Sequence, residues 1–274
     1  MTLGVDTPAL TFIVPVRHQD NASDWPKLKA NLEQTLASLS AQLSSNWRGV
    51  VVANHGADLP PMPEGFSVER VDFPANKLHD MGSASRDEVL DAFRLDKGRR
   101  VLAGMLAGRD TDYFMIVDDD DCVSNRLAGW VRENSGPVGW KIGRGYVWND
   151  GSRLLYEHDD FNHVCGSSLI IQRGVYELPD TFDEADMEFV KAMMGSHHGV
   201  DRRMEAEGTP LQQVPFRAAV YRVGHAGSHS QTAGIFRKYV LAGRWKRHLL
   251  GTLRRLARLR RVTAPIRREF FGGR

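Results

Sequence analysis

The chain has 274 residues, of which 42% are hydrophobic and 26% are charged, and its formal net charge is +2. That length is enough for one large α/β domain or two small ones with a buried core. The two cysteines, Cys122 and Cys165, show no Cys/His ligand spacing, which argues against a disulfide framework and a structural zinc site. No segment approaches the roughly 20 apolar residues that span a bilayer, and no export signal is visible at the N-terminus. We therefore expect a cytoplasmic protein.

The first half of the chain alternates apolar runs with stretches of helical periodicity. Leucines at helical spacing, from Leu28 to Leu43, follow the first apolar run, and Asp24 and Pro26 are suited to cap and begin that helix. This order predicts an α/β fold with a mainly parallel, Rossmann-like sheet flanked by helices. The expected strands are residues 11–16, 49–53, 67–72 and 113–117, with a second helix around 99–107.

The second half of the chain has a different pattern. Gly, Trp and Tyr interleave through residues 138–151, which indicates antiparallel strands and turns. A strand-like stretch at 165–179, a helix near 184–207 and a strand at 214–222 are expected to follow.

Four consecutive aspartates, Asp118 to Asp121, follow the strand expected at 113–117. Ligands bind beyond the carboxyl ends of the strands in open parallel sheets, so this position favours a functional role. Adjacent carboxylates repel one another unless a cation neutralises them, and hard oxygen ligands suit Mg²⁺ or Mn²⁺. Asp118 and Asp120 can face one ion together, because alternate residues of an extended or turning chain point to one side. The alternative is a solvated acidic turn that caps a helix expected at 125–132.

The stretch FMIVDDDDCVS resembles the D-x-D motif of GT-A glycosyltransferases, which use nucleotide-sugar donors with a divalent metal bridging the diphosphate. Three further stretches are similar to family-2-like members and occur in the same order, over most of residues 10–230. They are TFIVPVRHQDNASDWPKLKANLEQTLASLSAQ near the start, DKGRRVLAGMLAG at 96–108 and HHGVDRRMEAEGTPLQQVPFRAAVYRVGH at 197–225. The resemblance implies a GT-A catalytic domain at 1–235, with a nucleotide-sugar half at about 1–125 and an acceptor half at 126–235.

The same resemblance implies which residues form the donor site. Asp118 and Asp120 would hold the metal, with His225 or, alternatively, His229 as a third ligand, and Asp121 would be a water-mediated ligand or a helix cap. The ion would act as a Lewis acid that neutralises the leaving nucleoside diphosphate. Asn54 stands near the place of a family Asp that accepts the uracil N–H, a contact that an amide can also make. The residues expected to contact the UDP-sugar are Pro15, Arg17, Asn54, Asp72, Lys97, Arg100, Asp118, Asp119, Gly166 and Ser167.

Asp201 matches the family's catalytic base, which opens a helix facing the acceptor and takes the proton of the acceptor hydroxyl in an inverting transfer. Val200 stands where a glutamate usually precedes it, so His197, His198 and Asp160 remain as substitutes. The alternative role for Asp201 is an ordinary helix N-cap. The residues expected to stack on an acceptor sugar are Tyr146 and Trp148, with core packing as their alternative.

Residues 236–274 form a basic C-terminal extension with a net charge of +12, against −10 for the rest of the chain. A basic amphipathic helix suits an anionic membrane surface, so we expect residues 244–274 to hold the protein at the inner face of the cell membrane. The alternatives are packing on the acidic body and nucleic-acid binding, and the missing aromatic interleaving argues against nucleic acid. The leucines near one helical face are Leu249, Leu250, Leu253, Leu256 and Leu259.

These features predict a metal-dependent glycosyltransferase that moves a sugar from a UDP-sugar, of the UDP-galactose or UDP-glucose type, to a glycan or lipid-linked acceptor. Such an enzyme would take part in building a cell-surface polysaccharide. One alternative is a phosphohydrolase of the haloacid dehalogenase type, since Asp119 and Asp121 also satisfy D-x-D-x-V with Asp119 as nucleophile. That class carries the motif on its first strand, however. A non-catalytic sugar- or nucleotide-binding module is the other alternative.

Overall fold

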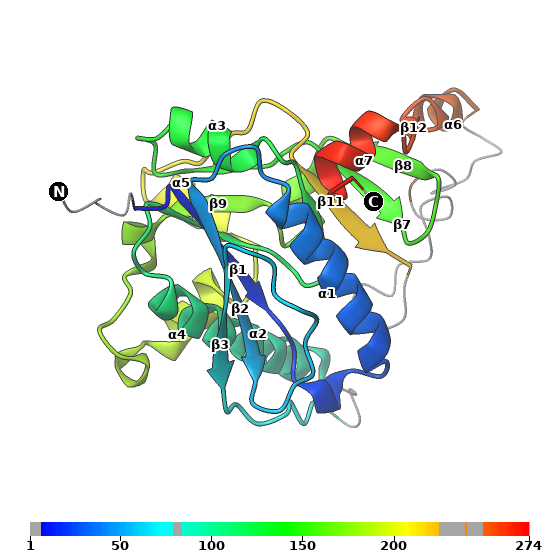
Figure 1. Ribbon diagram of the computed structural model, residues 1–274. Helices are drawn as coiled ribbons and strands as arrows, with labels where there is room; N and C mark the ends of the chain where they lie inside the picture. The colour runs from blue at the N-terminus through cyan, green and yellow to red at the C-terminus, as the bar shows by residue number, and fades with distance from the viewer. Residues whose placement is uncertain (1–6, 79–83, 225–238, 240–248, 274) are drawn as a thin grey trace.

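The computed structural model describes residues 7–78, 84–224, 239 and 249–273. Its first half alternates long strands and helices, and its second half consists mostly of short strands and 3-10 turns (Figure 1). The strands are β1 (Leu10–Pro15), β2 (Trp47–Asn54), β3 (Phe66–Val71), β4 (Tyr113–Ile116), β5 (Cys122–Val123), β6 (Gly139–Lys141), β7 (Gly145–Asn149), β8 (Leu154–His158), β9 (Leu169–Gln172), β10 (Gln212–Gln213), β11 (Ala219–Val223) and β12 (Leu259–Arg261). The α-helices are α1 (Trp25–Ser40), α2 (Arg86–Ala107), α3 (Leu127–Glu133), α4 (Met187–Met193), α5 (Val200–Ala206), α6 (Leu249–Leu256) and α7 (Ala264–Phe270). The 3-10 helices are η1 (Gln19–Asn21), η2 (Phe161–His163), η3 (Arg173–Tyr176) and η4 (Phe182–Glu184).

A seven-stranded sheet in the order β10-β6-β9-β4-β1-β2-β3 forms the centre of the fold. The pairs β1–β2, β2–β3, β1–β4 and β6–β10 are parallel, whereas β9 runs antiparallel to both of its neighbours. The sheet is flanked by helices. The fold is therefore mixed α/β with a mainly parallel sheet, which confirms the predicted fold class.

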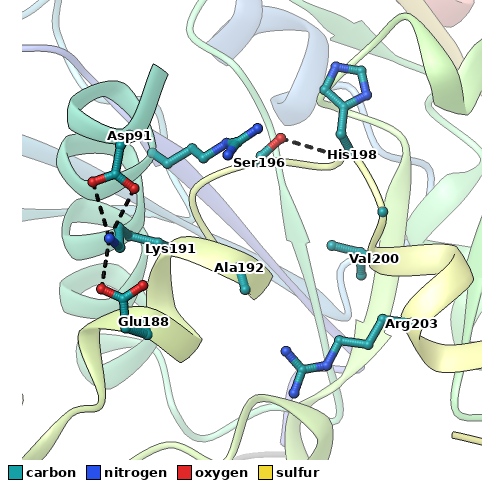
Figure 2. Close-up of a pocket in the computed structure, with 10 residues that line it drawn as sticks. Asp91, Glu188, Lys191, Ala192, Ser196, His198, Val200 and Arg203 are labelled. Atoms are coloured by element: carbon teal, nitrogen blue, oxygen red, sulfur yellow. Dashed lines mark hydrogen bonds and ion pairs between the residues drawn. The ribbon is translucent and has the colours of Figure 1, made fainter. Parts of the chain in front are cut away.

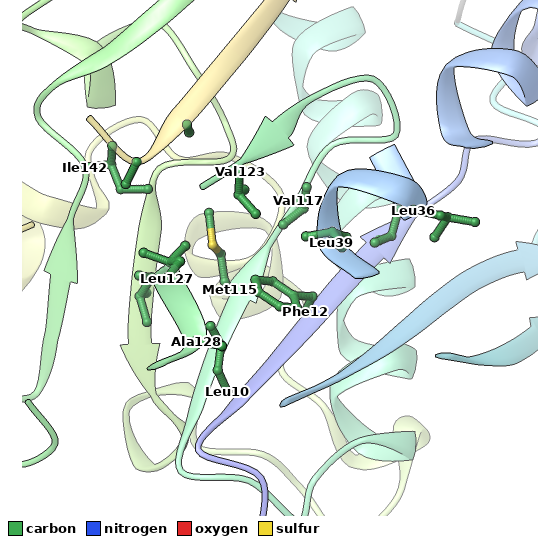
Figure 3. Close-up of a cluster of buried hydrophobic side chains, with 14 of the residues drawn as sticks. Leu10, Phe12, Leu36, Leu39, Met115, Val117, Val123, Leu127, Ala128 and Ile142 are labelled. Atoms are coloured by element: carbon green, nitrogen blue, oxygen red, sulfur yellow. The ribbon is translucent and has the colours of Figure 1, made fainter. Parts of the chain in front are cut away.

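The two faces of this sheet bury different sets of apolar side chains, because successive residues of a strand point to opposite faces. Leu10 and Phe12 of β1 pack with Leu36 and Leu39 of α1 and with the apolar face of α3 (Figure 3). Ile13, the residue after Phe12, points to the other face and joins the cluster formed with α2 and α4. Helices therefore cover both faces and leave the strand ends as the accessible edge.

The ends of the helices follow from local sequence, and two predicted boundaries were wrong. Asp24 caps α1 by accepting a hydrogen bond from the Lys27 N–H at 2.9 Å, as predicted. The helix ends at Ser40, however, and Leu43 beyond it is 76% exposed rather than part of the buried face. The helix predicted across 184–207 is two helices, α4 and α5, and Gly199 between them adopts φ 86°, a left-handed conformation that a continuous helix does not allow.

A second, five-stranded sheet has the order β12-β8-β7-β11-β5. Strand β12 pairs antiparallel with β8, and the Phe270 ring of α7 is buried against Tyr146 at 5.6 Å between ring centroids. Residues 259–270 of the expected extension are therefore built into the second sheet and its covering helix. None of the helices in the described ranges is both long and apolar enough to cross a membrane.

The direction in which the chain adds strands reverses between β1 and β4. From β1 the chain continues outward through β2 to β3, then returns along α2 to place β4 on the other side of β1. In open α/β sheets, ligands bind at such a switch point, beyond the carboxyl ends of the two strands. The aspartates that follow β4 and the residues that follow β1 lie at this edge.

Candidate functional site

The four aspartates form a tight turn between β4 and β5. The N–H of Asp121 donates to the main-chain carbonyl of Asp118 at 3.2 Å, which closes the turn. Asp119 and Asp121 are buried, whereas Asp118 and Asp120 keep partial exposure. The two aspartates predicted to bind metal are therefore the two that solvent reaches.

Asp121 anchors this turn to the start of β9 and to β11. Its carboxylate accepts hydrogen bonds from the Ser167 hydroxyl at 2.7 Å, the Cys165 thiol at 3.2 Å and the main-chain N–H of Arg222 at 3.2 Å. Burial, and then the charges of Asp120 and Asp118, raise the pKa of Asp121 well above its ordinary value. None of these three bonds goes to α3, whose first turn is instead capped by Gln42, which accepts from the Ala128 N–H at 2.8 Å.

Ser167 also holds the other end of the turn. The main-chain N–H of Asp118 donates to the Ser167 hydroxyl oxygen at 2.9 Å, while the same hydroxyl donates to Asp121. One side chain thus fixes both corners of the aspartate turn. Neither this bridge nor the bond from Arg222 was predicted, because no local sequence signal brings residues 167 and 222 to residue 118.

Lys97 of α2 forms an ion pair with the Asp118 carboxylate. Burial lowers the pKa of Lys97, but the charge of Asp118 and its hydrogen bond outweigh burial and raise that pKa overall. Gly166 lies directly against this pair, and a Cβ at Gly166 would overlap Asp118 Oδ2 and lie 3.2 Å from Lys97 Nζ. A larger residue at position 166 would therefore displace the Asp118 carboxylate from its present place.

The chemistry of the aspartate turn fits a hard divalent cation. Asp118, Asp120 and Asp121 lie close enough for their charges to raise the pKa of Asp121, and Lys97 supplies one positive charge. Carboxylate oxygens are the ligands that Mg²⁺ and Mn²⁺ prefer. Within the described residues, no three Asp, Glu, His or Cys side chains already form a complete metal cluster. The third ligands proposed from the sequence, His225 and His229, lie outside the described residues.

The residues predicted to bind the nucleoside are only partly brought together. Pro15, which is buried, ends β1 at the switch point, and Arg17, which is partly exposed, follows it. Asp72 is exposed directly after β3. Asn54 is buried, and its amide donates to the Phe73 carbonyl at 2.7 Å and accepts from the Arg100 guanidinium at 2.7 Å. The Asn54 amide is thus engaged by the protein itself.

Arg100 is buried at the core side of α2. Its guanidinium bonds to Asn54 and to the Asp96 carboxylate, at 3.1 Å and 3.2 Å for the latter. A side chain with these partners supports the packing of α2 on β2, whereas Lys97, three residues earlier, reaches the aspartate turn. The structure therefore separates the two basic residues that the sequence placed in one donor site.

Asp201 lies in the first turn of α5, and its carboxylate contacts side chains of β6 and of the 3-10 helix η2. Its carboxylate is 3.4 Å from Lys141 Nζ of β6 and accepts a hydrogen bond from the Asn162 amide at 3.3 Å. Gly199, not Asp201, occupies the N-cap position of α5, which excludes the cap as the role of this carboxylate. Lys141 and Asn162 hold it in a fixed orientation.

The two histidines before α5 lie near the aspartate turn. Their rings are 4.0 Å apart, and burial, His198 and Lys97 lower the pKa of His197 to about 4. Asp118 opposes this shift, so His197 lies within electrostatic reach of the aspartate turn. The Nε2 atom of His197 is buried and has no hydrogen-bond partner in the described chain. Asp160, the third substitute base, is 3.4 Å from the His163 ring.

Tyr146 and Trp148, the expected acceptor platform, point toward the C-terminal helix. The Tyr146 ring packs on Phe270, and the Trp148 ring packs on Phe271 at 5.0 Å and donates its N–H to the Ser152 carbonyl. These contacts are the core-packing alternative considered from the sequence. Whether either ring also touches a sugar stays a prediction.

No protein-family model and no curated protein matches this sequence. Similar solved structures include S. aureus TarS 1–349, with 12% identity over 78% of this chain and 60% of that chain and a TM-score of 0.43. Another is S. aureus TarS, with 10% identity, 78% and 36% coverage and a TM-score of 0.39. A third is Rv0371C complexed with manganese from Mycobacterium tuberculosis H37Rv, with 11% identity, 90% and 99% coverage and a TM-score of 0.33.

This chain therefore spans 60% and 36% of the two TarS chains. At these TM-scores the likeness carries no conclusion about activity. The functional assignment below rests on the residues of this chain.

Proposed function

We propose that this protein is a metal-dependent GT-A-type glycosyltransferase that uses a UDP-sugar as donor and a glycan or lipid-linked molecule as acceptor. The observation that carries the proposal is the place of the aspartate turn. Asp118 lies two residues beyond the end of the central strand β4, at the switch point of the sheet, where α/β folds bind nucleotides. The two partly exposed carboxylates of the aspartate turn, those of Asp118 and Asp120, are suited to bind a divalent cation.

Different residues of this chain would have different roles in such a transfer. Asp118 and Asp120 would hold Mn²⁺ or Mg²⁺, which when bound would neutralise the charge of the leaving diphosphate. Lys97, already at Asp118, is placed to turn its ammonium to a phosphate oxygen. Gly166 leaves room for the donor because it carries no side chain beside this pair.

Asp201 is the proposed base of an inverting reaction. A base must reach the proton of the acceptor hydroxyl, and its carboxylate is held at the start of α5 by Lys141 and Asn162. We expect Asp201→Asn to reduce kcat by at least about 100-fold, the typical contribution of a general base, while UDP affinity stays unchanged. If UDP affinity and kcat fall together, Asp201 has a structural role instead.

The hydrolase alternative is less compatible with the structure. The motif follows β4, the fourth strand, and not the first. Its two key carboxylates, Asp119 and Asp121, are both buried, and Asp121 is bonded to Ser167 and Cys165. A phosphate monoester would have to reach a buried nucleophile. The binding-module alternative needs the donor site but no base.

The deciding experiment measures UDP release from a panel of UDP-sugars with Mn²⁺, with and without candidate acceptors. Release that depends on both metal and acceptor supports transfer. Phosphate release from monoesters without a nucleotide-sugar would support the hydrolase, and UDP-sugar binding without any turnover would support the binding module.

We further propose that α6 holds the protein on an anionic membrane. Leu253 and Leu256 on this helix are 52% and 41% exposed, and Arg254 is exposed between them. Apolar side chains flanked by arginines suit the interface of an anionic bilayer. The following β12 and α7 belong to the protein body, so the proposed contact is narrower than residues 244–274.

A further inference from the structure

A cavity of about 330 Å³ opens between α2, α4 and α5, next to the donor site (Figure 2). The residues that line it come from three segments: Asp91 and Arg94 on α2, Glu188, Lys191 and Ala192 on α4, and Ser196, His198, Gly199, Val200 and Arg203 around the start of α5. His198 lines the cavity, and its ring contacts that of His197, which lies within reach of Lys97 and Asp118. None of the residues assigned to the donor or to the metal lines this cavity.

Two arginines line the cavity with side-chain N–H groups that have no partner within the described residues. The Arg94 side chain is exposed and forms no hydrogen bond or ion pair with any described residue. Arg203 uses its Nε in an ion pair with Glu207 at 2.9 Å, and among the described residues its terminal nitrogens have no hydrogen-bond partner. Figure 2 shows the Arg203 side chain extending along the cavity toward α4. A guanidinium is suited to bidentate bonds with phosphate or carboxylate oxygens.

The acidic side chains that line the cavity, Asp91 and Glu188, form ion pairs with Lys191. Lys191 lies 2.9 Å from the Asp91 carboxylate and 2.8 Å from that of Glu188, and Figure 2 shows both carboxylates turned toward its ammonium. This cluster lies on the α2 and α4 side, away from His198. The N–H donors of Arg94 and Arg203 are therefore not satisfied by these acids.

The charged groups that act most strongly on His198 are basic. Burial lowers the pKa of His198, and Arg94, His163, Arg202 and Lys97 lower it further by repulsion. An anion in the cavity would offset these charges.

We propose that this cavity binds an anionic group, a phosphate or a carboxylate, of the glycosyl acceptor, through Arg94 and Arg203. Val200 lines the cavity and directly precedes Asp201, so an acceptor anchored here would continue past the start of α5 toward the proposed base. The cavity is of a size that takes one small polar group, at the low end of the roughly 300–1,000 Å³ of ligand sites. The assignment of this anion to an acceptor rests on the proposed function, whereas the anion binding does not.

The test uses inorganic phosphate and glycerol 3-phosphate as probes in metal-free buffer, with glycerol as the neutral control. Binding is followed by NMR on the His198 ring, whose resonance is assigned with His198→Gln. Both anions are expected to shift the resonance and to raise the pKa of His198, because they offset the cations around it. Glycerol is expected to do neither.

Matched variants locate the site. Arg94→Gln and Arg203→Gln should each weaken the phosphate response about tenfold or more, the cost of a lost charge-assisted bond. Arg86→Gln, an exposed arginine on the same helix outside the cavity, and Glu207→Gln, which removes only the partner of Arg203, should retain it.

The outcome that overturns the proposal is a response of equal strength in wild type and in both arginine variants, or none in wild type. Asp120→Ala separates this site from the donor site. Its phosphate response should equal that of wild type even if its UDP affinity is lost. If wild type shows no metal-dependent UDP binding, the proposed function is wrong, but the proposed anion site is not affected.

Discussion

Lys97 and Asp118 form an ion pair at the carboxyl end of β4, so the first aspartate of the turn already has a cationic partner without any ligand. The charge of Asp118 keeps the Lys97 ammonium protonated, since it raises the pKa of Lys97 despite burial. A metal ion bound at Asp118 would repel the Lys97 ammonium, because two positive charges would then lie at the same carboxylate. A donor diphosphate resolves this conflict if Lys97 moves from Asp118 to a phosphate oxygen.

Replacing Lys97 by methionine should therefore weaken binding of UDP with Mn²⁺. A charge-assisted hydrogen bond contributes about 1.5–3 kcal/mol, which corresponds to a loss of about 10- to 100-fold in affinity. Calorimetry of UDP in the presence of Mn²⁺ measures it. Lys141→Met, which removes the partner of Asp201, is the matched control and should keep UDP affinity. Equal affinities in Lys97→Met and wild type would show that Lys97 does not contact the donor.

Gly166→Ala should disrupt the donor site, because the new Cβ would overlap the Asp118 carboxylate and crowd Lys97. We expect the affinity for UDP with Mn²⁺ to fall by about tenfold or more, as for a lost charge-assisted contact. Gly174→Ala is the control, since a Cβ there meets no atom within 4 Å. Unchanged UDP affinity in Gly166→Ala would mean that the Lys97–Asp118 pair has no part in donor binding.

His197 should make stability depend on pH. Its pKa is lowered to about 4 in the folded protein, against about 6.5 unfolded. Below about pH 6.5 the unfolded chain binds more protons, so the stability that His197 contributes is complete above that pH and is lost as pH falls toward 4. Between about pH 7.5 and 5 we expect this histidine alone to cost about 2 kcal/mol of unfolding free energy.

Urea unfolding at these two pH values checks this expectation. The pH-dependent loss of stability should be smaller in His197→Gln than in wild type, and unchanged in His55→Gln, a variant of an exposed histidine. An identical pH dependence in His197→Gln and wild type would contradict the burial of a neutral imidazole.

Membrane association should depend on α6. The double variant Leu253→Glu/Leu256→Glu should lose sedimentation with anionic vesicles, because each basic residue near such a surface contributes only on the order of 1 kcal/mol and the apolar anchor is removed. Leu43→Glu, at an exposed leucine elsewhere in the chain, should sediment like wild type. Point variants are preferable to deletion, because removing residues 244–274 would also remove β12 and α7. Equal sedimentation of the α6 variant and wild type would contradict the membrane proposal.

The fold class and the first sheet were predictable because their signals are local. Apolar runs located β1, β2, β3 and β4 to within about two residues, a typical boundary error. The split between α4 and α5 was missed although two glycines, Gly195 and Gly199, stand between them in the sequence. A glycine is tolerated inside a helical pattern, and only the structure shows that Gly199 is left-handed. The position of β12 in the second sheet was also missed, since its partner β8 lies a hundred residues earlier.

The candidate site was predictable in position but not in detail. The order of strands along the chain predicts a mainly parallel sheet, and Asp118 then follows the strand at its switch point. The sequence did not separate Lys97 from Arg100, because both lie on the basic face of one helix and only the packing of α2 turns Arg100 inward to Asn54. Nor did it reveal that Ser167 bridges the corners of the aspartate turn, since that bond depends on the antiparallel pairing of β9 with β4.

The central claim is that a metal held by Asp118 and Asp120 binds the donor diphosphate. Calorimetry of UDP binding with Mn²⁺ and with EDTA, for wild type and Asp120→Ala, tests it most directly, with the exposed Asp112→Ala as control. We expect wild type and Asp112→Ala to bind UDP only with Mn²⁺, and Asp120→Ala to bind it at least about tenfold more weakly, since even removing an outer partner of a metal ligand costs about 10- to 100-fold. The same UDP affinity for Asp120→Ala and wild type in Mn²⁺ would contradict the metal-bridged donor site.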